Sequence, residues 1–150
     1  MKKIILLLLV PILTLSAKIV ETQSEALVTK GGLSFLFGEK EPFEGVVIMR
    51  DMNNTITYLS EYRSGKRHGK FTTFDRVGKS GKKVREELFV EGELILKITY
   101  HKNGVIREEL PIQDGKASGY SATYYKSGKI KALTLWKDGK QSGEPQHFKE

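Results

Sequence analysis

The stretch DGKASG, residues Asp114–Gly119, recurs as DGKQSG at Asp138–Gly143, 24 residues further along the chain. The segment between the two copies reads YSATYYKSGKIKALTLWK, with the turn-like sequence YKSG in its middle. Both arms around that turn are rich in Tyr, Thr, Ile and Leu, which favour strands, and both are bounded by residues that favour turns. The repeated unit is therefore predicted to be a pair of β-strands.

Two interleaved series of turns carry this period along most of the chain. The first reads DMNN, DRVG, HKNG and YKSG and ends at positions 54, 78, 104 and 128, with spacings of 24, 26 and 24. The second reads EKEPFEG, YRSGKRHG, IQDGKASG and WKDGKQSG, with a shortened member, FVEGE, at Phe89–Glu93. A constant period predicts about four copies of one supersecondary unit. We expect an all-β fold: an antiparallel β-hairpin meander of about four 24-residue units that forms an elongated sheet.

The glycines predict the conformation of the turns. A two-residue hairpin turn of the primed type needs a left-handed backbone at both central residues, which Val77 would resist. A three-residue loop, with a type I turn and then a left-handed residue, places Gly78, Gly104, Gly128 or Asn54 at the third position. The predicted structural turn residues are Gly45, Gly65, Gly69, Gly78, Gly104, Gly115, Gly119, Gly128, Gly139 and Gly143.

Aromatic residues also recur with the period. Counting across the three-residue loops pairs Tyr100 with Ile106 and Tyr124 with Ile130, and even separations along a strand keep residues on one face. We therefore expect one face to carry three columns that build the core of the sheet, with a ligand-binding platform as the alternative. The columns are Phe74, Tyr100 and Tyr124; Ile56, Ile106 and Ile130; and Tyr62, Phe89, Ile112 and Trp136.

The N-terminus predicts export. Lys2 and Lys3 precede the apolar run Ile4–Leu15, and Ala17 follows at a plausible cleavage point, which is the layout of a signal peptide. We expect residues 1–17 to be the signal peptide, 18–44 a leader or cap, and 45–150 the repeat domain. The leader strands, 27–28 and 33–37, are candidates to cover the second face of the sheet. With no cysteine in the chain, we expect a periplasmic, secreted or cell-envelope protein held together without disulfides.

These residues resemble a known family. LVTKGGLSFLFGEKEPFEGVVI at Leu27–Ile48 and YYKSGKIKALTLWKDGKQSG at Tyr124–Gly143 are similar to the bacterial MORN-repeat variant family, whose members often carry the label YwqK-type antitoxin. The resemblance covers about Leu27–Gly143, but the middle segment, GKSGKKVREELFVEGELILK, has a two-residue insertion and lacks the second loop glycine. The resemblance implies a β-hairpin array that contacts proteins or membranes, and it brings no catalytic residues.

The sequence offers no catalytic, cofactor or metal site. GKS at Gly78–Ser80 lacks the glycine that a phosphate-binding loop needs five residues earlier. The histidines, at 68, 101 and 147, are scattered over loops or ends, and without cysteine the usual structural zinc sites are excluded. The pairs Glu86–Glu87 and Glu108–Glu109 are neighbours in strands, so their side chains point to opposite faces and are expected to be solvent-facing charge.

The expected function is therefore that of an exported, non-enzymatic MORN-like repeat protein, a protein-binding or cell-envelope scaffold module without a cofactor. The expected partner is another protein or the cell envelope, and neither nucleic acid nor a small-molecule substrate is inferred. Two alternatives remain open. One is an antitoxin or immunity protein that neutralises a toxin. The other is a module that associates with an anionic membrane surface, which the net charge of +7 would favour.

Overall fold

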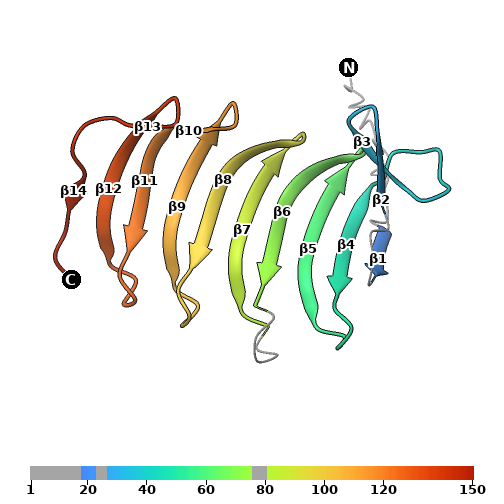
Figure 1. Cartoon of the computed structure of the whole chain (residues 1–150), viewed down its shortest axis with the longest axis horizontal. Coiled ribbons are helices and arrows are strands. Elements are labelled where there is room, and N and C mark those ends of the chain that lie inside the picture. Colours follow the sequence, from blue (N-terminus) through green and yellow to red (C-terminus); the bar gives the residue numbers. More distant parts are fainter. Residues whose placement is uncertain (1–17, 23–26, 76–80) are drawn as a thin grey trace, which may run out of the picture.

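The computed structural model describes residues 18–22, 27–75 and 81–150, and in these ranges every regular element is a β-strand (Figure 1). Twelve strands form one large open sheet, and β2 and β3 form a separate hairpin. The strands are β1 Lys18–Thr22, β2 Leu27–Lys30, β3 Leu33–Leu36, β4 Gly45–Arg50, β5 Ile56–Arg63, β6 Lys66–Phe74, β7 Lys83–Val90, β8 Glu93–Tyr100, β9 Ile106–Gln113, β10 Lys116–Ala117, β11 Gly119–Tyr124, β12 Ile130–Lys137, β13 Lys140–Gln141 and β14 Gln146–His147.

The large sheet follows the order of the chain. From β4 to β9 each strand pairs with its sequence neighbour, and β11 and β12 continue the sheet in the same antiparallel way. The strand β1 is the exception, because it pairs with β4 in parallel and forms one end of the sheet. At the other end, β13 and β14 both pair with β12. The predicted all-β meander of hairpins is thus confirmed.

The first series of turns has the predicted three-residue form. Asn54, Gly104 and Gly128 have φ values of 63°, 86° and 90°, and each donates its N–H to the carbonyl three residues earlier at 2.9 Å. We call the edge of the sheet that carries these loops the broad-turn edge. The copy that ends at Gly78 lies outside the described residues.

The second series consists of tighter turns. Four two-residue turns have a left-handed backbone at both central positions, which is the type I′ conformation that suits the twist of antiparallel strands. We call their edge of the sheet the tight-turn edge. The turns are Ser64–Gly65, Glu91–Gly92, Asp114–Gly115 and Asp138–Gly139. The shortened repeat FVEGE therefore makes the same turn as the other copies.

The predicted sharing of faces was wrong for the third column, Tyr62, Phe89, Ile112 and Trp136, because each broad turn is followed by a β-bulge. Tyr124 pairs with Ile130 as predicted, but Thr123 pairs with Ala132, so Lys131 is an extra residue on β12. The same shift follows Tyr100, which pairs with Ile106. Two residues of one strand that are separated by an even number of positions normally lie on the same face, but they lie on opposite faces when the extra residue of a bulge stands between them. Phe74, Tyr100 and Tyr124 therefore lie on one face of the sheet, and Tyr62, Phe89, Ile112 and Trp136 lie on the other.

Side chains also join one repeat to the next at the broad-turn edge. His101 Nε2 lies 2.9 Å from the carbonyl oxygen of Tyr124, and Asn103 Nδ2 donates to the carbonyl of Lys126 at 2.8 Å. Tyr125 donates its hydroxyl to the carbonyl of Phe148 at 2.8 Å. Each of these contacts spans 23 residues. The repeat period is therefore built into the lateral contacts as well as into the turns.

Within the described part of the chain, the sheet forms a single layer over most of its length. In Figure 1 the β2–β3 hairpin lies in front of one end of the sheet, near β4, and no other labelled strand lies over the sheet. The leader was predicted to cover the second face, but its hairpin covers only this end. Few apolar side chains in the described ranges are consequently buried: Phe43, Val47, Phe89, Ile112 and Ala132.

Candidate functional site: the groove beneath the β2–β3 hairpin

A groove of about 570 Å³ lies between the β2–β3 hairpin and the large sheet. This volume is within the roughly 300–1,000 Å³ typical of ligand sites. We call this face of the sheet the groove face, defined by Val47, Tyr58, Tyr62, Phe71 and Phe89. The residues that line the groove include Leu27 and Thr29 of β2, Val47 of β4, Tyr58 and Tyr62 of β5, and Lys66 and Arg67 of β6.

Backbone hydrogen bonds fix the hairpin in this position. Ser34 donates its N–H to the carbonyl of Gly65, and Gly65 donates to the carbonyl of Phe43, both at 2.8 Å. Phe43 in turn donates to Ser34 at 2.8 Å. The Phe43 side chain is 2% exposed and packs edge-on against Tyr62, with ring centroids 5.6 Å apart. The first tight turn of the large sheet therefore holds the hairpin over the groove face.

Arg67 is held by aromatic rings. Its guanidinium carbon lies 4.8 Å from the ring centroid of Phe71 and 5.4 Å from that of Phe89, distances that favour cation–π attraction. Phe71 also packs against Tyr58, with centroids 5.3 Å apart. Among the described residues Arg67 forms no ion pair. Glu91, which also lines the groove, instead lies 3.2 Å from His68 Nδ1.

The hairpin contributes a free strand edge. Within the described ranges β2 pairs only with β3, through Leu27–Leu36 to Lys30–Leu33. Thr29 is exposed and lines the groove. Strand edges with unpaired N–H and C=O groups can accept an additional strand. The groove thus combines an aromatic floor, a cation held in place and a strand edge, and this arrangement can bind an extended chain.

The opposite face carries one buried and one partly buried carboxylate, Glu86 and Glu109. We call it the ladder face, defined by Thr72, Glu86, Tyr100, Glu109 and Tyr124. Glu86 is 5% exposed and accepts hydrogen bonds from Tyr100 and, at 2.7 Å, from Lys83. Tyr124 donates to Glu109 at 2.6 Å. The prediction that these glutamates are solvent-facing charge was therefore wrong for Glu86, although the two neighbours of each pair do point to opposite faces.

Equivalent positions of the ladder face hold either a glutamate and a tyrosine or a leucine and a phenylalanine. In the strand register a glutamate lies diagonally across from each ladder tyrosine, two residues from a direct pair. The same positions in the first and last repeats hold leucine and phenylalanine, at Leu59–Phe74 and Leu133–Phe148. A tyrosine hydroxyl therefore occurs only in the repeats in which a glutamate can accept its hydrogen bond. In the first and last repeats the hydroxyl and the carboxylate are both missing. The carboxylates satisfy tyrosine hydroxyls, so we assign them a structural role.

Hydrogen bonding and burial shift the pKa values of the ladder. Burial opposes ionisation of Glu86, but hydrogen bonds from Lys83 and Tyr100 outweigh it and lower the pKa of Glu86. Burial and the hydrogen bond to Glu86 raise the pKa of Tyr100 well above its ordinary value. The hydrogen bond to Glu109, together with burial, raises the pKa of Tyr124 to about 12.

These shifts predict a loss of stability at high pH. Because the pKa of Tyr124 is higher in the folded state than its unfolded value of about 10, its contribution is complete below about pH 10 and is lost as pH rises towards 12. Urea unfolding of Tyr124→Phe should show a smaller fall in the free energy of unfolding across this window than the wild type shows. Tyr120→Phe, at a side chain that is 66% exposed, is the control. An equal fall in all three proteins would contradict the assignment.

The sequence-predicted site residues lie in several places. Tyr62 and Phe89 belong to the groove face, whereas Tyr100 and Tyr124 form the ladder with Phe74 at an equivalent position. Trp136 donates its indole N–H to Ser121 at 2.9 Å. The described glycines that were predicted to form turns all have positive φ, but not all of them lie in turns. Gly45, Gly69 and Gly119 belong to β4, β6 and β11, so the predicted turn position was wrong for these three. The other six lie between strands, at Gly65, Gly104, Gly115, Gly128, Gly139 and Gly143.

Sequence reasoning did not single out Tyr58, Arg67 and Phe71. Phe71 lies between the polar residues Lys70 and Thr72 along β6, which was the available signal, whereas Tyr58 is followed by Leu59 and carries no such signal. The two strands that form the roof of the groove were recognised, but not their position.

The described residues contain no cluster of three or more metal-binding side chains, and they form no helix that could cross a membrane. Comparison with known proteins finds no family model that matches this sequence and no curated protein that is similar to it, so the resemblance to MORN-repeat variants stays a prediction.

Proposed function

We propose that this chain is an exported, non-enzymatic MORN-like repeat protein that acts as a protein-binding or cell-envelope scaffold module, with the groove beneath β2–β3 as its docking site. One observation supports this proposal most: the hairpin roofs an aromatic groove in which Arg67 is held between Phe71 and Phe89 without an anionic partner among the described residues. The proposed export rests on the sequence of residues 1–17, which lie outside the described ranges. An antitoxin or immunity protein would be the same module with a toxin as its partner.

Site-specific photo-cross-linking tests the docking site in the producing cell. A benzoylphenylalanine at Tyr62 lies in the groove, and the same group at Tyr120 lies on the opposite face, where the tyrosine is 66% exposed. We expect a discrete protein adduct from position 62 and none from position 120. The same adduct from both positions, or no adduct from position 62, would count against the groove.

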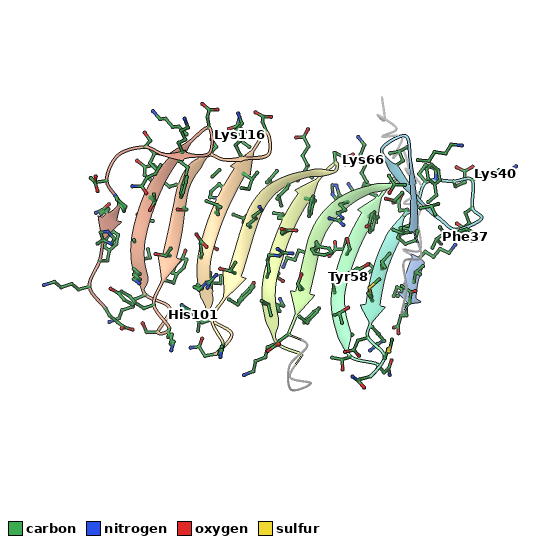
Figure 2. All side chains as sticks on the ribbon, in the orientation of Figure 1. Phe37, Lys40, Tyr58, Lys66, His101 and Lys116 are labelled. Carbon is green, nitrogen blue, oxygen red and sulfur yellow. The ribbon has the colours of Figure 1, made fainter. Side chains whose placement is uncertain are left out.

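The broad-turn edge supports a second candidate function, association with an anionic membrane surface. Figure 2 shows Lys66 and Lys116 along the tight-turn edge and His101 at the opposite one. Among the described residues, acidic side chains at the broad-turn edge are few, namely Asp51, Asp75 and Glu150. Each basic residue near such a surface contributes about 1 kcal/mol. Exposed lysines at or beside the broad turns are Lys82, Lys102, Lys126, Lys129 and Lys149.

Vesicle flotation separates this candidate from protein binding. We expect the protein to float with anionic vesicles at low salt and to remain at the bottom at high salt, because screening weakens the attraction. The double variant Lys102→Glu/Lys126→Glu should no longer float, whereas Lys66→Glu/Lys116→Glu at the tight-turn edge should behave like the wild type. Equal recovery with neutral vesicles, or without lipid, would reject membrane association.

A further inference from the structure

We infer that the groove binds an extended acidic segment of a partner protein, which adds to the free edge of β2 as a strand and places a carboxylate on Arg67. This inference rests on the proposed function and identifies the chemistry of the partner. Three observations on the described residues support it: Arg67 has no anionic partner among them, aromatic side chains form the floor of the groove, and β2 pairs with none of their strands except β3.

Arg67 is suited to a carboxylate. A guanidinium presents its donors in a planar fork that matches a carboxylate in two parallel hydrogen bonds. The contacts with Phe71 and Phe89 restrict the side chain before any ligand arrives, so little additional conformational entropy is lost on binding. Two glutamates, at 91 and 93, also line the groove, yet neither forms an ion pair with Arg67. The anion is therefore expected to come from outside the described part of the chain.

The other charged residues of the groove neither neutralise Arg67 nor replace it as the site for a carboxylate. Glu91 lies beside His68. The side chain of Lys66 runs alongside Gly92, where an added Cβ would lie 3.6 Å from the lysine Cβ, so the stem of Lys66 rests on the neighbouring tight turn. Arg67 is also the direct cross-strand partner of Tyr62, which places the cation beside the aromatic floor.

The strand edge defines the form of the ligand. An extended chain that pairs with β2 gains main-chain hydrogen bonds from residues 27–30, and its alternate side chains point towards the sheet. Leu27 and Thr29 line the groove from the hairpin, and Val47, Tyr58 and Tyr62 line it from the sheet. An alternating segment would therefore place apolar side chains on Tyr58 and Tyr62 and one acidic side chain on Arg67.

A display library of random twelve-residue peptides tests the inference with the full chain as bait. We expect the wild-type protein to enrich alternating sequences with Asp or Glu at one fixed position. Bait carrying Arg67→Gln should lose the acidic preference, and Arg67→Lys should retain it only weakly, because an ammonium cannot form the paired hydrogen bonds. Arg107→Gln on β9 is the matched control and should enrich the same sequences as the wild type. Thermal unfolding of each bait establishes that it is folded.

Measuring the affinities of one selected peptide and of the same peptide with a Glu→Gln substitution at the acidic position completes the test. The substituted peptide should bind the wild type about tenfold or more weakly, as expected for a lost charge-assisted hydrogen bond. Arg67→Gln should bind both peptides with similar affinity. Enriched peptides without an acidic position would overturn the inference but leave the protein-binding function standing. If no peptide is enriched, the inference fails and the cross-linking from Tyr62 decides separately on the proposed function.

Discussion

Replacing Gly45 by alanine is expected to lower the free energy of unfolding by about 3 kcal/mol and to detach β1 from the sheet. Gly45 has a φ of 142° and is buried where β1 pairs in parallel with β4. A Cβ at this position would lie 1.9 Å from the carbonyl oxygen of Lys18. Because the neighbouring atom is backbone, the clash can be relieved only if β1 moves away.

A matched control separates the clash from the cost of the left-handed backbone. Gly115 has a φ of 75°, but no atom lies within 4 Å of its added Cβ. Gly115→Ala should therefore cost only about 1–2 kcal/mol, the penalty for a left-handed alanine. Chemical denaturation measures both variants, and amide hydrogen exchange of residues 18–22 should accelerate in Gly45→Ala alone. Equal losses of stability in the two variants would show that the close approach of β1 is not decisive.

The Glu86–Tyr100 pair should show strong thermodynamic coupling. Tyr100→Phe removes a hydrogen bond to a buried carboxylate and should cost about 1–3 kcal/mol. Glu86→Leu leaves the Tyr100 hydroxyl without its acceptor and should cost about 1–2 kcal/mol. The double variant recreates the leucine–phenylalanine pairs found at Leu59–Phe74 and Leu133–Phe148. It should therefore be more stable than the sum of the single changes predicts, by roughly 1–2 kcal/mol.

Urea unfolding at neutral pH gives the four free energies of this cycle. If the costs of Glu86→Leu and Tyr100→Phe simply add, the pair does not act as a unit, and the coupled residue change between the repeats has another cause.

The architecture could be predicted because its determinants are local. Glycine and asparagine recur where a left-handed backbone is required, as at Asn54, Gly104 and Gly128. These positions locate the loops, and strand-forming residues fill the intervals between them. The pairing of Tyr100 with Ile106 follows directly from the loop length. Local turn residues also explain why FVEGE was recognised as a shortened repeat. Its turn at Glu91–Gly92 forms although the segment lacks the second loop glycine of the other copies.

The features that were missed depend on contacts between distant segments. The extra residue of the bulge on β12 is Lys131, which is neither glycine nor proline, so nothing in the local sequence marks the bulge. The position of the β2–β3 hairpin depends on hydrogen bonds that join Ser34, Phe43 and Gly65. Burial of Glu86 depends on a tyrosine 14 residues away. The glutamate–tyrosine pairs of the two central repeats and the leucine–phenylalanine pairs of the first and last become equivalent only when the strands are aligned in register.

Hydrogen exchange of the full chain, alone and with the partner recovered by cross-linking from Tyr62, tests most directly whether the groove is the binding surface. Binding should slow exchange in β2, at residues 27–30, and around the groove in β5 and β6, while the broad-turn loop at His101–Val105 exchanges as before. Slower exchange at the broad turns, with β2 unchanged, would contradict the account and favour the lysine-bearing edge as the binding surface.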